Sequence, residues 1–121
     1  MKRSDQRREA VFALYQHDVT GKPLADLEGE VKPFTRALID GVEAGRAELD
    51  EAIGAASKGW ALDRIAPLEL NIMRVAIYEA RELEDVPTEV AIDEAVELAK
   101  AYCGADAPGY VNGVLASILV D

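Results

Sequence analysis

Basic and aromatic side chains gather at the start of the chain, where their spacing could bind single-stranded nucleic acid. Arg7 and Arg8 precede Tyr15 by about two helical turns, so guanidinium groups and a ring would lie along one stretch of helix. Cationic groups bind phosphates and flat rings stack on unpaired bases, which are the contacts that single-stranded RNA recognition uses. A tyrosine at helical spacing is more often a core residue, and for Tyr15 that alternative stays open.

A second candidate group lies near the carboxyl end, in the stretch DAPGYVNGVLASIL that begins at Asp106. Tyr110 offers another ring, and the side-chain amide of Asn112 can both donate to and accept from a base edge. Asn112 and Gly113 would suit a hairpin turn, but the apolar residues around them recur at helical spacing and predict a helix. Gly113 costs a helix about 1 kcal/mol relative to alanine. We therefore expect it to allow close packing against a neighbour, with Tyr110 and Asn112 facing RNA; the alternative is that Asn112 and Gly113 serve only packing and capping.

Catalytic and metal-binding chemistry is not indicated. His17 and Cys103 are single residues of their kinds, too few for a metal site. Cys103 lies on the apolar face of its predicted helix, far in sequence from an activating base, and is interpreted as a small buried hydrophobic residue. No glycine-rich phosphate loop occurs. The sequence predicts a binding protein with no catalytic residue, no metal and no cofactor.

Charge is unevenly distributed along the chain. The net charge at pH 7 is −10, which by itself argues against nucleic acid. The first eight residues nevertheless hold four basic side chains and one acid, whereas residues 79–97 hold eight acids and one arginine. Segregated charge of this kind predicts a basic contact for nucleic acid and an acidic docking surface. A basic terminus that is merely solvated would have the same composition.

The size and composition favour one helical domain. The chain has 121 residues, of which half are hydrophobic and 6% aromatic. It contains no apolar run of membrane-spanning length, no secretory signal behind its first charges and no second cysteine for a disulfide. We expect a cytoplasmic protein that does not associate with membranes.

Helical periodicity runs along the chain, so helices must position the candidate residues. We expect helices over about 4–19, 33–59, 68–83, 88–104 and 106–119, with a short helical turn in WALDRIAP whose Trp60, Leu62 and Ile65 point inward. Residues 68–83 are apolar on nearly all sides and predict the central helix. Thr88 and Asp106 are expected N-caps. The predicted fold class is all-α, with about six or seven helices and roughly antiparallel neighbours.

The same residues resemble a known family. MKRSDQRREAVFALYQHDV is similar to the arginine-rich opening of the NusB family of bacterial transcription antitermination factors. WALDRIAPLELNIMRVAIYE and DVPTEVAIDEAVELAKAYCGADAPGYVNGVL are similar to its later motifs, and the similarity covers essentially the full chain. The resemblance implies two packed three-helix bundles in a single domain, with an N-terminal half at about 1–56 and a C-terminal half at about 57–121.

The resemblance also implies partners and site residues. The protein would pair with NusE, a ribosomal small-subunit protein, bind boxA RNA of ribosomal RNA leaders and help RNA polymerase read through terminators in an antitermination complex. RNA contacts would fall on Lys2, Arg3, Arg7, Arg8, Tyr15, Asp106, Tyr110 and Asn112, and partner contacts on Tyr15 and Glu69. We expect a monomer or a weak homodimer, and one cleft shared by the arginines and the Tyr110–Asn112 pair.

Other functions remain possible. Family members often carry lysine where this chain has Gly109, so we hypothesise that it binds boxA weakly alone and needs NusE for further positive surface. A helical protein-interaction scaffold of this fold would bind NusE with weak or no RNA specificity. An accessory domain of an RNA cytosine methyltransferase is not expected, because no catalytic domain follows Asp121 in this sequence.

Overall fold

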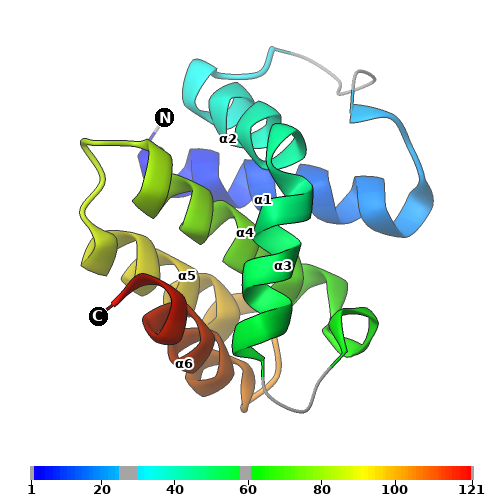
Figure 1. The fold of residues 1–121 in the computed structure, drawn as a ribbon. Helices are drawn as coiled ribbons and strands as arrows, with labels where there is room; N and C mark the ends of the chain where they lie inside the picture. Colours follow the sequence, from blue (N-terminus) through cyan, green and yellow to red (C-terminus); the bar gives the residue numbers. More distant parts are fainter. Residues whose placement is uncertain (1, 25–29, 58–60, 121) are drawn as a thin grey trace.

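The computed structural model describes residues 2–24, 30–57 and 61–120, and these ranges are helical without any strand (Figure 1). The elements are α1 (Arg3–Thr20), α2 (Pro33–Ala44), α3 (Arg46–Ala56), the 3₁₀ turn η2 (Leu62–Arg64), α4 (Pro67–Glu82), α5 (Thr88–Tyr102) and α6 (Ala107–Leu119). The predicted all-α fold class is confirmed. None of the helices in the described ranges combines the length and apolar character needed to cross a bilayer.

α4 is the central helix, as its apolar sides predicted. Leu70, Glu79 and every residue from 71 to 77 are buried. α4 contacts each of the other five α-helices. α1 and α2 pack against α4 and against each other, and so do α5 and α6. One helix in the middle of the sequence therefore supplies the core surface for both ends of the chain.

The region expected to form one helix from Pro33 to near Gly59 is two helices that meet at Gly45. The backbone of Gly45 leaves the helical region, with φ −106° and ψ 17°, and the chain changes direction there (Figure 1). Leu38 and Val42 before the bend and Leu49 and Ile53 after it are buried. The bend lets both segments place apolar side chains on the core, which a straight helix of this length would not do.

The helix starts match the sequence with two differences. Pro33 and Pro67 open their helices, where a missing N–H costs no intrahelical bond. Pro87, not Thr88, holds the N-cap position of α5. Asp106 holds the N-cap position of α6, but its side chain makes no capping hydrogen bond. In the short turn, Ile65 is buried and Leu62 is partly buried, whereas Trp60 lies outside the described residues.

A polar network ties the end of α1 to α3 and α4. Asp18 accepts hydrogen bonds from Arg46 at 2.6 Å, from Arg74 at 2.8 Å and from Asn71 at 2.9 Å. Arg74 also donates to both carboxylate oxygens of Asp50, at 2.7 and 2.9 Å. Burial acts to raise the pKa of Asp18, but the hydrogen bonds from Asn71 and Arg46 and the charges of Arg46 and Arg74 outweigh it and hold this pKa below the usual 3.8. The network fixes the end of α1 beside the first half of α4.

Candidate nucleic-acid and partner interface

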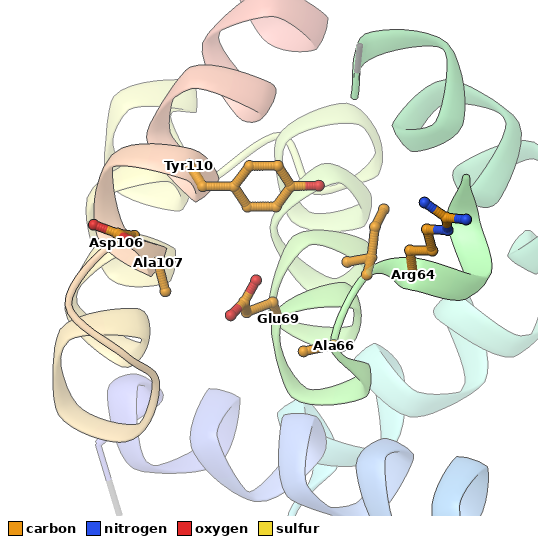
Figure 2. A pocket seen from close by; sticks show the side chains of 7 residues that line it. Arg64, Ala66, Glu69, Asp106, Ala107 and Tyr110 are labelled. Carbon is orange, nitrogen blue, oxygen red and sulfur yellow. The ribbon is translucent and has the colours of Figure 1, made fainter. Parts of the chain in front are cut away.

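Three residues predicted to bind RNA or a partner meet at one pocket, where η2, α4 and α6 come together. The pocket has a volume of about 360 Å³ and is lined by Arg64, Ile65, Ala66, Glu69, Asp106, Ala107 and Tyr110. Figure 2 shows the Glu69 carboxylate below the Tyr110 ring, pointing into the space between that ring and Ala107. The Asp106 carboxylate is turned outward at the rim. We call this hollow the Glu69 pocket.

The ring of Tyr110 is anchored across the Glu69 pocket by its hydroxyl group. The hydroxyl oxygen lies 2.6 Å from Oγ of Ser57, a buried residue at the C-cap of α3. Because this hydrogen bond fixes the far end of the side chain, the ring forms a rigid wall of the pocket. The role of Ser57 could not be predicted from the sequence, because a serine at the end of a helix has many other uses.

Glu69 is a carboxylate partly withdrawn from water. Burial raises its pKa above the ordinary 4.5, because the charged form loses hydration beside apolar walls. Within the described part of the chain it forms no ion pair, although Arg64 lines the same pocket. Burial and the charge of Glu69 also raise the pKa of the nearby Cys103 thiol, which opposes formation of a nucleophilic thiolate. The pocket therefore suits a cationic group supplied from outside.

Arg7 does not lie on the surface, which corrects its prediction as an exposed RNA contact. Its side chain is 6% exposed, and Nε donates to both carboxylate oxygens of Glu79 at 2.8 Å. Nη1 lies 3.4 Å from Oε1 of Glu94, and the guanidinium lies 5.4 Å from the centroid of the Phe34 ring. Arg7 is thus held by α2, α4 and α5, and its charge is matched inside the protein.

The other basic residues at the start of the chain are more exposed. Arg3 pairs with Asp85 at 2.9 Å and lies 4.5 Å from the centroid of the Phe34 ring. Arg8 pairs with Asp5 one turn earlier at 3.2 Å, and the side chains of Arg3 and Arg8 remain 49% and 43% exposed. Lys2 is exposed.

The two charged regions are neighbours, not opposite poles. Arg3 and Arg7 pair with Asp85, Glu79 and Glu94, all of which belong to the acidic segment 79–97. In Figure 1 the start of α1 and the end of α4 lie on the same side of the molecule. Packing of α1 along α4 brings the regions together, so the expectation of a basic end separate from an acidic body is wrong.

The arginines of α1 do not line the Glu69 pocket that Tyr110 lines. Arg7 contacts Glu79 near the end of α4, whereas Tyr110 shares its pocket with Glu69 near the start of that helix. The two glutamates are ten positions apart along the helix, which corresponds to about 15 Å. The Glu69 pocket includes no residue of α1. The Glu69 pocket is therefore not the single cleft that we expected the arginines and Tyr110 to share.

Asn112 and Tyr15 lie outside the Glu69 pocket. Asn112 is exposed on α6, two residues after Tyr110 and so on a different side of the helix. Tyr15 is half-buried on α1. A Cβ placed on Gly113 would meet nothing within 4 Å, so the prediction that this glycine allows close packing is wrong.

α1 and the end of α5 form an aromatic pair that the predicted site did not include. The rings of Phe12 and Tyr102 meet edge to face, with centroids 5.0 Å apart and planes at 88°. Tyr102 is 46% exposed at the end of α5. The spacing of Arg8, Phe12 and Tyr15 along α1 could have revealed half of the pair, since residues three and four apart share a helix face.

The sequence and the fold are both similar to those of one protein family. The NusB family model matches residues 4–119. A transcription antitermination protein NusB from Rubrobacter xylanophilus is 42% identical, over 95% of this chain and 88% of the relative. A structure of NusB from T. maritima has a TM-score of 0.88 at 29% identity and covers 98% of this chain and 91% of its own. A crystal structure described as NusB and NusE in complex with dsRNA shares the fold, with a TM-score of 0.82 at 23% identity and 98% coverage of both chains.

Proposed function

The chain belongs to the NusB family of transcription antitermination proteins, and from this premise we propose that it binds boxA RNA of ribosomal RNA leaders together with NusE and promotes read-through by RNA polymerase. The role is regulatory, not catalytic, and its place is the cytoplasm. The observation that carries the proposal is the meeting of Glu69, Asp106 and Tyr110 around one pocket. One structural neighbour is described as NusB with NusE and dsRNA, and the proposal transfers such an assembly to this chain.

Glu69 is the proposed contact for NusE. A carboxylate that has lost hydration but has no cationic partner in the described residues favours a lysine or arginine side chain from outside. The aliphatic stem of such a side chain would pack against Ile65, Ala66 and Ala107, which line the same pocket. The net charge of −10 would also speed the approach of a basic ribosomal protein.

The proposed RNA contacts use the exposed members of the predicted set. Lys2, Arg3 and Arg8 would bind phosphates, and Arg3 would exchange its exposed pair with Asp85 for a phosphate at a cost of about 1 kcal/mol or less. Asp106 at the pocket rim can accept from a base amino group, and the exposed amide of Asn112 can bond a base edge. The remaining members of the proposed surface are the rings of Tyr15 and Tyr110.

The ion pairs formed by the arginines at the start of α1 support a second candidate function. Arg7 is enclosed, and both Arg3 and Arg8 already have acidic neighbours. A protein whose cations are partly neutralised would bind RNA weakly by itself. A helical scaffold that binds NusE with weak or no RNA specificity is therefore the alternative, and in either case the free protein is proposed to be a monomer or a weak homodimer.

The proposal is tested by measuring the binding of labelled boxA RNA and of a scrambled strand. Each strand is titrated with and without NusE, over a range of salt concentrations. We expect boxA to bind more tightly than the scrambled strand, and NusE to increase that preference. If Lys2, Arg3 and Arg8 neutralise about three phosphates, log affinity falls against log salt with a slope of roughly −2. Equal affinity for both strands with NusE binding retained would establish the scaffold function instead.

A further inference from the structure

We propose that Phe12 and Tyr102 form a stacking platform for one unpaired base of the bound RNA. The inference rests on the proposed function, because it assigns two further residues to the RNA surface. It concerns a surface formed by α1 and the end of α5, outside the Glu69 pocket.

α1 and α5 run side by side in the same direction along this surface. Oγ of Ser4 donates to Oε1 of Glu94 at 2.8 Å, and eight residues further along each helix the ring of Phe12 meets the ring of Tyr102. Eight residues correspond to about 12 Å of helix. Side chains thus join the two helices at both ends of this stretch.

The aromatic pair has the exposure and rigidity of a binding surface. Tyr102 remains 46% exposed in spite of its contact with the Phe12 ring, so part of its surface is available to a ligand. The edge-to-face contact with Phe12 restrains the orientation of both rings, as such aromatic pairs do. A restrained, exposed ring loses little conformational freedom when a base stacks on it.

The neighbours of the pair favour nucleic acid over another occupant. Arg8 lies one turn before Phe12 on the same face of α1, and its side chain is 43% exposed, so a phosphate bound there would place the next base near the rings. On the other side, Asp106 follows Tyr102 by four residues and lines the Glu69 pocket. The platform thus connects the basic start of α1 with the pocket, as a strand that touches both would require.

The test uses Tyr102→Leu, which removes the ring but keeps apolar bulk, and Tyr102→Phe, which keeps the ring. Val90→Ala is the matched control, because Val90 is 39% exposed near the opposite end of α5. In the presence of NusE, whose own binding to each variant is measured separately, each protein is titrated with boxA RNA and with a set of boxA strands that each carry one abasic position. For Tyr102→Leu we expect affinity for intact boxA to fall about tenfold, while Tyr102→Phe and Val90→Ala stay within about twofold of the unmodified protein.

The abasic strands separate stacking from an indirect effect. One abasic position should weaken binding to the unmodified protein about tenfold and should carry no further penalty with Tyr102→Leu, because ring and base form one interaction. If Tyr102→Leu binds RNA as Val90→Ala does, or loses NusE and not RNA, the platform is overturned while the proposed function stands. If the unmodified protein does not prefer boxA over a scrambled strand, the proposed function is overturned and the platform with it. Thermal unfolding of each variant confirms that it is folded.

Discussion

Arg7 and Glu79 form an ion pair in the interior, with Nε of Arg7 donating to both carboxylate oxygens at 2.8 Å and side chains only 6% and 1% exposed. The pair joins the first turns of α1 to the last turns of α4. Arg7 thereby serves the fold, although its neighbours in the sequence suggested a contact for RNA. Removal of Arg7 would leave the Glu79 carboxylate buried without its ion-pair partner.

Replacement of Arg7 should therefore cost far more stability than replacement of the adjacent Arg8. We expect Arg7→Ala to lower the free energy of unfolding by about 3–5 kcal/mol, because Glu79 would lose the buried partner that compensates for its lost hydration. Arg8→Ala removes an exposed pair with Asp5 and should change it by less than about 1 kcal/mol. Urea denaturation of both variants measures the difference. Equal midpoints for the two would show that the pair carries no structural role.

Replacement by alanine should raise the stability of the protein at one helical glycine and lower it at another. At Gly113 a Cβ would meet no atom within 4 Å, so Gly113→Ala should raise stability by about 0.5–1 kcal/mol and Tm by about 3–6 °C. At Gly41 the ring of Tyr78 occupies the space that a Cβ would need, so Gly41→Ala should destabilise the protein by about 1–3 kcal/mol. Thermal melts of the two variants provide the comparison. A stabilised Gly41→Ala would mean that the Tyr78 ring moves aside freely.

Binding of NusE should weaken in mild acid through Glu69. Burial places the pKa of Glu69 above 4.5, and a cationic partner binds only the ionised form, so affinity should fall as the pH decreases toward that pKa. Glu69→Gln should bind NusE weakly at pH 7 and lose this part of the pH dependence. Calorimetric titrations between pH 7 and pH 5 measure both effects, with the exposed Glu51→Gln as a control.

Glu69→Gln should weaken NusE binding but should not destabilise the folded protein. An acid whose folded pKa is raised stabilises the fold below its unfolded pKa, and that contribution is lost as the pH rises through the folded value. At pH 7 the charged carboxylate is thus the less favourable form in the folded protein. Glu69→Gln should melt no lower than the unmodified protein at pH 7, so a clear loss of stability would assign Glu69 to the fold and not to a partner.

Removal of the carboxylate beside Arg3 should strengthen RNA binding. Asp85 pairs with Arg3 at 2.9 Å, and both side chains are about half exposed or more. Since such a pair contributes about 0.2–1 kcal/mol, we expect Asp85→Asn to raise boxA affinity about two- to fivefold at low salt. Glu51→Asn, which removes one exposed acid from α3, controls for the change in net charge. An equal gain in both variants would show that net charge alone, and not the pairing of Arg3, limits binding.

Periodicity was sufficient to predict the elements whose apolar residues face the core. It indicated α4 as the central helix and α6 as a helix in spite of the Asn112–Gly113 pair. It did not indicate the break at Gly45, because Leu38, Val42, Leu49 and Ile53 continue a helical pattern across it. Glycine is tolerated within helices, so only the shape of the core beneath decides whether the chain bends there.

The candidate site was less predictable, because its decisive contacts join distant parts of the sequence. Arg7 and Arg8 are adjacent and alike in sequence, and only Glu79, 72 residues from Arg7, makes one of them a core residue. Tyr110 gains its orientation from Ser57, 53 residues away. Phe12 and Tyr102 acquire a common surface only when α5 lies along α1. The resemblance of motifs predicted a set of contact residues, and burial in the structure limits which of them RNA or a partner protein can reach.

The position of α4 between the first and last helices has a consequence for synthesis of the protein. A nascent chain that ends after α3 has Leu14, Leu38 and Ile53 without the helix that covers them, because α4 contacts every other helix. Such an intermediate would present bare apolar faces to chaperones and proteases until residues 67–82 leave the ribosome. Premature termination within the first half should consequently yield rapidly degraded fragments and not a stable truncated form.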